Sequence, residues 1–158
     1  MTLNERLSSE RLAVEAVRYK WALEELRFSP ELEHVREVIK VADRNNLNIV
    51  TVLAIVTGES SWNERASNYN TGSNDYGLFQ LNNTWHNQYR SNINRHIRAG
   101  IEHYKWCLDT ENNNERKALI RYNTGHGDNA HGSRYANYIL GIKRQIETKA
   151  RQFKVRGL

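Results

Sequence analysis

The sequence contains little cysteine and little proline, with one residue of each in 158 positions. A single cysteine excludes an internal disulfide and a zinc site with four cysteine ligands. Cys107 is therefore expected to be a buried helix residue. With one proline, long helices are seldom interrupted, and 26% charged with 39% hydrophobic residues favours a helical globule. The length suits one domain around one core, so residues 1–158 are interpreted as a single domain.

Long hydrophobic runs are also missing. The most apolar stretch, residues 49–56, is far shorter than the roughly 20 residues that cross a bilayer, so no membrane span is expected. Residues 1–20 alternate charged residues with short aliphatic ones, a pattern that does not predict a secretory signal. We find no internal repeat, low-complexity tract or linker that would define a second domain.

Two helices are expected before the most apolar segment. Apolar residues recur over residues 4–27 with Glu and Arg between them, which predicts an amphipathic helix. Its core-facing side chains are expected to be Leu7, Val14, Val17, Trp21, Leu23 and Leu26. Ser29 as the cap, Pro30 at the first helical position and Glu31 in the first turn predict a second helix that ends at Ala42. Its inner residues are expected to be Leu32, Val35, Ile39 and Val41.

The centre of the fold is expected in the third helix. Asn48 can cap a helix over residues 49–58 that is apolar on nearly every side. Residues 62–81 combine Asn, Ser, Gly and Asp with alternating Tyr76, Leu78 and Gln80, which predicts a small loop-and-hairpin lobe. Further helices are expected near residues 92–108, 115–122 and 133–153.

Glu59 follows the most hydrophobic helix, at its C-terminal end. Burial raises the pKa of a carboxyl group because the charged form loses hydration, and the negative end of the helix dipole acts in the same direction. Both effects favour a neutral acid near neutral pH. Such a group can donate a proton to a glycosidic oxygen and later accept one. Glu59 is therefore the candidate general acid and base.

The motifs around Glu59 resemble the catalytic segment of the lysozyme superfamily. Glu-Ser-Ser-Trp-Asn at 59–63 precedes Ser-Asn-Asp-Tyr-Gly-Leu-Phe-Gln-Leu-Asn at 73–82, and this second stretch resembles animal lysozymes and the specialised transglycosylases of secretion systems. Ala99-Gly100 before Tyr104, Tyr-Asn-Thr-Gly at 122–125 and Tyr135-Ala136 resemble the soluble lytic transglycosylases. The resemblance covers about residues 35–146 and leaves a first helix, residues 1–28, without a counterpart.

The resemblance implies a mainly α (α+β), lysozyme-like fold, with a helical lobe and a small β-hairpin lobe flanking a substrate groove. It implies that Glu59 is the acid and base, that Gln80 hydrogen-bonds the sugar, that Tyr122 and Asn123 line the cleft, and that Tyr135 lies near the acid. The residues expected to bind substrate are Ser60, Tyr76, Phe79, Gln80, Tyr122, Asn123 and Tyr135.

Asp75 leaves two reactions open. In lysozymes that hydrolyse, a second carboxylate forms a covalent intermediate or stabilises the charge on the sugar, and Asp75 occupies the matching place. In soluble lytic transglycosylases the acetamido group of the substrate assists and a sugar hydroxyl attacks. Tyr-Asn-Thr-Gly at 122–125 favours that second route. Asp75 is also open to a purely structural role in the hairpin turn.

The expected substrate is peptidoglycan, cleaved at the β-1,4 bond between N-acetylmuramic acid and N-acetylglucosamine by a monomer without a cofactor. No metal site is expected, although His126, Asp128 and His131 share a Gly-rich loop that can bind a cation or edge the cleft. The absence of a secretory signal favours a phage-encoded lysis or virion enzyme, or one exported by a dedicated route.

Two readings from other classes stay open. Residues 115–158 hold ten Lys or Arg against three Asp or Glu, and this charge suits nucleic acid or the acidic polymers of a cell wall. No base-reading motif supports nucleic acid, so no nucleic-acid partner is expected. A glycan-binding module without activity would require an inert Glu59.

Overall fold

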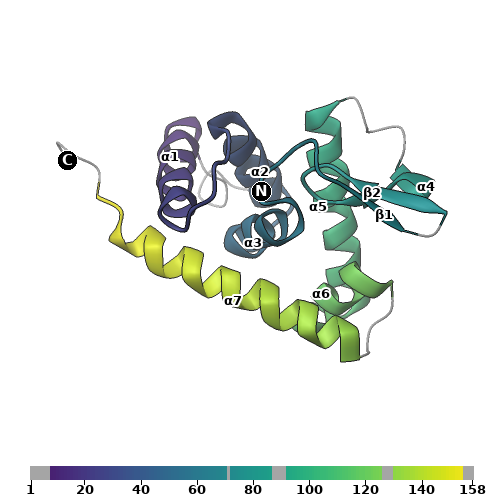
Figure 1. Ribbon diagram of the computed structural model, residues 1–158. Helices are drawn as coiled ribbons and strands as arrows, with labels where there is room; N and C mark the ends of the chain where they lie inside the picture. Colours follow the sequence, from purple (N-terminus) through teal and green to yellow (C-terminus); the bar gives the residue numbers. More distant parts are fainter. Residues whose placement is uncertain (1–7, 71, 87–91, 126–129, 155–158) are drawn as a thin grey trace.

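The computed structural model describes residues 8–70, 72–86, 92–125 and 130–154. These residues form a mainly helical fold with a small antiparallel sheet (Figure 1), as predicted. The elements are α1 (Ser9–Glu25), α2 (Leu32–Arg44), α3 (Ile49–Ser60), β1 (Ser67–Asn70), β2 (Ser73–Tyr76), β3 (Leu81–Asn82), α4 (Asn83–His86), α5 (Ile93–Thr110), α6 (Glu115–Thr124) and α7 (Ala130–Gln152). Across the described residues, no helix is both long and apolar enough to cross a membrane.

Helix α3 lies at the centre of the helical lobe. The side chain of Asn48 accepts a hydrogen bond from the Thr51 amide and caps the helix, as predicted. Its residues from Val50 to Thr57 are all buried, which explains why no amphipathic stripe marks it in the sequence. The helix ends at Ser60, and the next two residues, Ser61 and Trp62, adopt positive φ angles of 51° and 68°. This left-handed pair turns the chain from the core towards the sheet.

Helix α7 is a long helix of 23 residues. It packs against α1, α3 and α6 and runs along one side of the molecule (Figure 1). Its inner residues are Gly132, Ala136, Ile139, Ile142, Ile146 and Ala150. Gly58 of α3 lies directly under Ile139, because a Cβ atom at Gly58 would be 2.4 Å from Ile139 Cδ1. Two helix backbones therefore approach closely beside Glu59.

The inner face of α1 matches the prediction at Leu23 and partly at Leu26 but not at Val14 and Val17, and Leu7 lies outside the described residues. Val14 and Val17 were expected in the core, but each is 46% exposed. The buried residues are Leu12, Ala16, Ala22 and Leu23, with Tyr19 and Leu26 packed partly against the same core. The stripe from Leu12 through Ala16 and Leu23 has regular helical spacing, and it faces α2 and α7. The aliphatic residues of this helix recur at mixed spacings, so the pattern predicted an inward position for Val14 and Val17 that the packing does not give them.

The start of α2 is also a correction. The helix begins at Leu32 with Glu31 as its cap, and that cap makes no side-chain hydrogen bond. Ser29 and Pro30 therefore precede the helix, and Pro30 is not its first residue. Leu32 was expected to face inward but is 41% exposed, whereas Val35, Ile39 and Val41 are buried as predicted.

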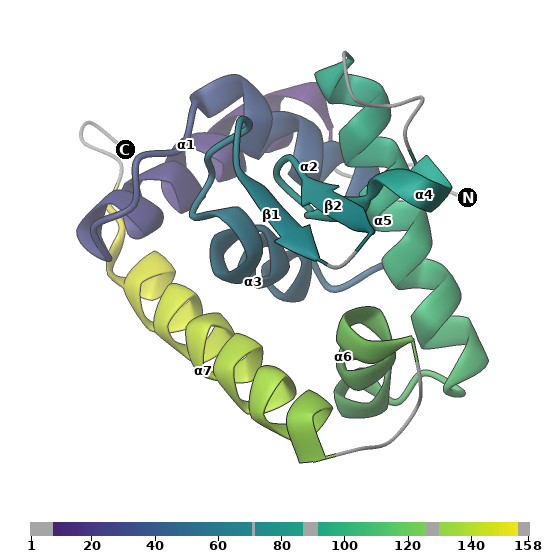
Figure 2. The ribbon, with the colours of Figure 1, turned by 45° about the vertical axis from the view of Figure 1, so that its right-hand side comes forward.

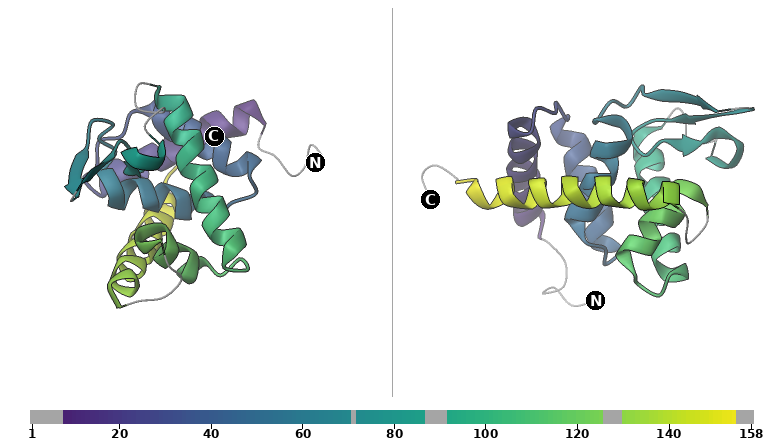
Figure 3. Two further views of the ribbon diagram at one scale, coloured as in Figure 1. Left: turned by 90° about the vertical axis from the view of Figure 1, so that its right-hand side faces the viewer. Right: turned by 60° about the horizontal axis from the view of Figure 1, so that its bottom comes forward.

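The small sheet forms the second lobe and has the strand order β1-β2-β3, all antiparallel. Asp75 lies between Asn68 on β1 and Asn82 on β3 in the register. Figure 2 shows the sheet beside α4 and the N-terminal half of α5, across from α6. Figure 3 shows it projecting from the helical lobe. The predicted hairpin lobe is thereby confirmed.

Candidate active site

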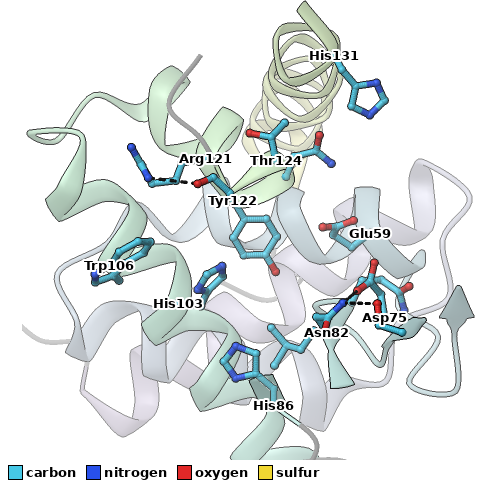
Figure 4. A pocket seen from close by; sticks show the side chains of 15 residues that line it. Glu59, Asp75, Asn82, His86, His103, Trp106, Arg121, Tyr122, Thr124 and His131 are labelled. Atoms are coloured by element: carbon cyan, nitrogen blue, oxygen red, sulfur yellow. Dashed lines mark hydrogen bonds between the residues drawn. The ribbon is translucent and has the colours of Figure 1, made fainter. Parts of the chain in front are cut away.

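A cleft of about 1010 Å³ lies between the two lobes. Its walls come from the end of α3, the sheet, α4, α5, α6 and the start of α7 (Figure 4). The lining residues are Glu59, Ser73, Asp75, Gln80, Leu81, Asn82, His86, His103, Trp106, Arg121, Tyr122, Asn123, Thr124, Gly125 and His131. Polar and aromatic side chains alternate along these walls, a lining that fits a hydroxyl-rich ligand.

Glu59 lies in the last turn of α3 and faces this cleft (Figure 4). Burial raises its pKa to about 7, and the nearby charge of Asp75 acts in the same direction. The hydroxyl of Tyr135, on α7, donates to Glu59 Oε2 at 3.2 Å and opposes that rise by stabilising the carboxylate. A carboxyl group with this pKa exchanges protons near neutral pH, as general acid and base catalysis requires.

Asp75 reaches the cleft from β2, on the sheet side. Its Oδ1 accepts a hydrogen bond from the Asn82 side-chain amide at 3.2 Å, and the same amide donates to Ser73 Oγ at 3.0 Å. Asn82 therefore fixes the side chain of Asp75 from the neighbouring strand. The cleft holds two carboxylates with different environments, one buried at a helix end and one in a polar strand setting.

Gln80 lines the cleft, but its amide is committed to the protein. Its Nε2 donates to the carbonyls of Ala66 at 3.0 Å and Gly77 at 2.9 Å, and its Oε1 accepts from Asn68 at 2.6 Å. These bonds connect the Gln80 side chain to Ala66 and Asn68 at the start of β1 and to Gly77 just after β2. Gln80 itself has a positive φ of 50°. The side chain shapes one wall of the cleft and holds the base of the sheet together.

Tyr122 and Asn123 enter the cleft from α6, as the sequence motif predicts. The hydroxyl of Tyr122 donates to the Phe79 carbonyl at 2.7 Å, which ties α6 to the loop between β2 and β3. Burial raises the pKa of Tyr122 well above its usual range, so the hydroxyl stays a donor. Asn123 is exposed and lines the cleft.

Four residues that were predicted to bind substrate do not line the cleft: Ser60, Tyr76, Phe79 and Tyr135, of which Tyr135 contacts Glu59 instead. Ser60 is buried and its hydroxyl donates back to the Val56 carbonyl at 3.1 Å, within α3. Tyr76 is 5% exposed, and its hydroxyl donates to the His86 carbonyl. Phe79 is fully buried. The family resemblance suggested contact, but the side chains of Ser60, Tyr76 and Phe79 point into the protein.

His96 lies beneath the same loop. Its Nε2 accepts a hydrogen bond from the Phe79 amide at 3.0 Å, and its ring packs where a Cβ atom at Gly77 would be 2.5 Å from Cε1. Burial, with a smaller effect of His86, lowers the pKa of His96 to about 4. The ring is therefore neutral at physiological pH and acts as a structural acceptor. The positive φ of Gly77, 79°, allows this close approach.

Within the described ranges, no group of three or more metal-ligating side chains is assembled. His131 stands at the start of α7 and lines the cleft, while His126 and Asp128 lie outside the described residues. Cys107 is buried in α5, as predicted.

Sequence reasoning missed several lining residues: His86, His103, Trp106, Arg121 and Thr124. His103 and Trp106 are three positions apart on α5, so they share one helix face. That spacing was visible in the sequence. Their approach to Tyr122 of α6 depends on the packing of two helices and was not visible.

Comparison with known proteins identifies the family of the chain. A family model described as "Transglycosylase SLT domain" matches residues 36–139. "Lysozyme C, tracheal isozyme" of Bos taurus and "Lysozyme C-3" of Ovis aries are each 35% identical over 57 residues, which is 35% of this chain and 39% of each relative. The chain thus spans about two fifths of the length of the curated relatives it matches. No solved structure matches. The predicted relation to the lysozyme superfamily is confirmed.

Proposed function

This chain belongs to the transglycosylase SLT domain family, and on that basis we propose that it cleaves the glycan strands of bacterial peptidoglycan. The bond attacked is the β-1,4 link between N-acetylmuramic acid and N-acetylglucosamine. The observation that carries the proposal is the Glu59 carboxyl group, with a pKa of about 7, at the wall of a cleft between two lobes. The described residues supply no further general acid with this combination of burial and access to the cleft.

Glu59 acts first as the acid. Its proton moves to the glycosidic oxygen, the bond from that oxygen to the anomeric carbon breaks, and the leaving sugar departs as an alcohol. Positive charge develops on the sugar ring that keeps the anomeric carbon. The resulting Glu59 carboxylate is then stabilised by the hydrogen bond from Tyr135. The same bond therefore favours the product state of this proton transfer.

The second half of the reaction is lytic transglycosylation. The acetamido oxygen of the substrate bonds to the anomeric carbon, as the family resemblance implies. A hydroxyl of the same sugar then displaces it and gives its proton to the Glu59 carboxylate. The product is an anhydro ring, and Glu59 returns to its starting protonation state. No cofactor enters this balance.

Hydrolysis is the second candidate, because Asp75 lines the same cleft as Glu59 and is held by Asn82. A carboxylate fixed in this way can stabilise the charged sugar or bond to its anomeric carbon, after which water completes the cleavage. The similarity to lysozymes C supports this alternative. The two routes share Glu59 and differ in what attacks the sugar.

Mass spectrometry of the cleavage products separates the routes. Purified peptidoglycan is digested with the protein, and the ends of the released fragments are measured. We expect anhydromuramic ends, which lack one water relative to a reducing end. Reducing ends alone would replace transglycosylation by hydrolysis, and no soluble fragments at all would overturn the proposed activity.

Glu59→Gln tests the acid. The substitution removes the exchangeable proton and changes little volume, so we expect an intact fold and at least an approximately 100-fold loss of cleavage. Glu64→Gln is the matched control, since Glu64 is exposed outside the cleft and the same chemical change is made. Equal activity of the two variants would exclude Glu59 as the acid.

Asp75→Asn distinguishes the role of the second carboxylate. In the transglycosylase route we expect activity within about tenfold of wild type, because the acetamido group stabilises the sugar charge. A loss comparable to that of Glu59→Gln would favour two-carboxylate hydrolysis. Circular dichroism of the variant checks that the sheet, where Asn82 contacts Asp75, is retained.

The place of action follows from the substrate, which lies outside the bacterial cytoplasmic membrane. We propose a phage-encoded lysis or virion enzyme, or an enzyme exported by a dedicated route. Localisation of the protein in producing cells or in purified virions tests this assignment.

A further inference from the structure

Trp106 is exposed to a degree that packing does not explain. It lies on α5 and is 55% exposed. The other large hydrophobic residues with high exposure in the described part of the chain are Val14, Val17, Leu32, Tyr69 and Tyr138. Among all six, Trp106 alone lines the cleft. A large apolar ring left in water inside a binding cleft indicates a ligand contact.

The Trp106 ring is held in a fixed orientation by its neighbours. The His103 ring is stacked on it, with a centroid distance of 6.1 Å and an interplanar angle of 14°. The Arg121 guanidinium lies over the Trp106 ring, 5.8 Å from the centroid. Arg121 is itself fixed by Glu111, whose Oε2 accepts from Arg121 Nε at 2.8 Å. An ordered ring loses little conformational freedom on binding, which favours affinity.

These rings continue the wall that begins at Tyr122. His103 lies 5.3 Å from Tyr122 and 5.8 Å from His86, measured between ring centroids. Figure 4 shows Tyr122 between Glu59 on one side and His103 with Trp106 on the other. A ligand part that contacts Trp106 is therefore separated from the reacting carboxyl group by the width of Tyr122. It belongs to a sugar other than the one whose bond is cleaved.

The chemistry of this wall fits the apolar face of a sugar ring. The face of an indole carries negative charge density, and the C–H groups on one side of a pyranose are positively polarised. Burial and the neighbouring His86 lower the pKa of His103, so the ring behind Trp106 is uncharged at neutral pH. Asn123, exposed on the same cleft, supplies a polar side chain for hydroxyl and acetamido substituents. A stacked ring with polar groups around it distinguishes a sugar from an apolar ligand.

We propose that Trp106, oriented by His103 and Arg121, forms a remote sugar-stacking subsite that gives the protein a preference for glycan strands long enough to span the cleft from Glu59 to Trp106. The inference rests on the proposed function for its substrate class, and it adds the residue that selects strand length. A stack that is equally strong in the ground state and the transition state lowers KM for long strands and leaves kcat unchanged.

The test compares short and long glycans. Cleavage by the wild type and by Trp106→Ala is measured with disaccharide-repeat oligomers of increasing length that carry no stem peptides. We expect KM for the long oligomers to rise about tenfold in Trp106→Ala, while kcat and the values for the shortest cleavable oligomer are unchanged. Trp106→Phe keeps an aromatic face and is expected to recover most of the lost affinity. An equal effect at every length, or no effect at any length, overturns the proposal.

Tyr138→Ala is the matched control for removal of an exposed aromatic side chain. Tyr138 is 56% exposed, close to the 55% of Trp106, and it does not line the cleft. We expect no change in the length dependence of KM in this variant. A change equal to that of Trp106→Ala would show a general effect of lost surface aromatics and would overturn the subsite.

Binding in an inactive background separates failure of the inference from failure of the proposed function. Calorimetric titration measures the affinity for an N-acetylglucosamine hexamer of Glu59→Gln and of the Glu59→Gln and Trp106→Ala double variant. Weaker binding by about tenfold in the double variant supports the subsite even if the wild type cleaves no peptidoglycan. Cleavage by the wild type with unchanged hexamer binding in the double variant overturns the subsite and leaves the activity intact.

Discussion

The proton on Glu59 is set by three neighbours that come from different parts of the chain. The apolar end of α3 excludes water from the carboxyl group, Asp75 on β2 adds a negative charge, and Tyr135 on α7 donates a hydrogen bond. The first two raise the pKa and the third lowers it. The balance at about 7 lets one group donate and accept a proton within a single turnover.

This balance predicts opposite shifts for two conservative variants. Tyr135→Phe removes a hydrogen bond to the carboxylate, so the pKa of Glu59 rises above about 7. Asp75→Asn removes a negative charge, so the pKa of Glu59 falls. Titration of carbon-13-labelled glutamate by NMR measures both without any need for activity. Shifts of the same sign in the two variants would contradict this electrostatic account.

The pH-rate profile of Tyr135→Phe gives a second readout. The general acid must be protonated, so activity declines as pH rises through the pKa of Glu59. Because that pKa rises in Tyr135→Phe, we expect the decline to begin at higher pH than in the wild type. A decline at lower pH would contradict the hydrogen bond as the cause.

At the scale of elements, the position of the cleft wall depends on the contact between α5 and the loop that follows β2. Gly100 on α5 faces Phe79, and a Cβ atom at Gly100 would be 2.3 Å from Phe79 Cγ. The Phe79 backbone in turn receives hydrogen bonds from Tyr122 and donates one to His96. A single small residue on α5 thus sets how closely the loop between β2 and β3 approaches this helix.

Two glycine substitutions are predicted to have opposite effects on stability. Gly100→Ala forces Phe79 to move, so we expect a loss of about 1–3 kcal/mol in the free energy of unfolding and weaker cleavage. Gly141→Ala, in the interior of α7, meets no atom closer than Arg144 Nη2 at 3.9 Å, so we expect a gain of about 0.5–1 kcal/mol. Chemical denaturation measures both values. Stabilisation by Gly100→Ala would contradict the packing described here.

At the scale of the whole molecule, two buried groups, Glu59 and His96, give stability opposite dependences on pH. Glu59 has a folded pKa of about 7, above its unfolded value of 4.5, so its contribution is fully present below pH 4.5 and is lost as pH rises to 7. His96 has a folded pKa of about 4, below its unfolded value of 6.5, so its contribution is present above pH 6.5 and is lost as pH falls to 4. The two slopes oppose each other over the same window.

Glu59→Gln removes one of these slopes. We expect the free energy of unfolding of this variant to match that of the wild type near pH 4. The value should exceed that of the wild type increasingly up to about pH 7, by as much as about 3 kcal/mol, and the melting temperature should rise with it. His96→Gln should instead flatten the loss of stability below pH 6.5. Differential scanning calorimetry across pH measures the differences. A constant offset between Glu59→Gln and the wild type at all pH values would contradict the raised pKa.

The sequence alone determined the features that depend on local pattern. Eight consecutive buried positions need a continuous apolar run, so α3, its Asn48 cap and the acid at its end are visible in the order of residues. The hairpin follows from its Gly- and Asn-rich turns. These elements place the candidate acid before any packing is known, and the resemblance of residues 59–63 and 73–82 to lysozymes implies the family.

Tertiary structure decided the features that depend on distant neighbours. The inner face of α1 is chosen by α2 and α7, so the exposed Val14 and Val17 were misassigned. Ser60 is adjacent to Glu59 in sequence but points back into α3, whereas Tyr135 reaches the acid from 76 positions away. Trp106 becomes part of the cleft because α5 packs against α6. Burial and charge act through space, so the proton affinity of Glu59 and the extent of the cleft arise only when the lobes are assembled.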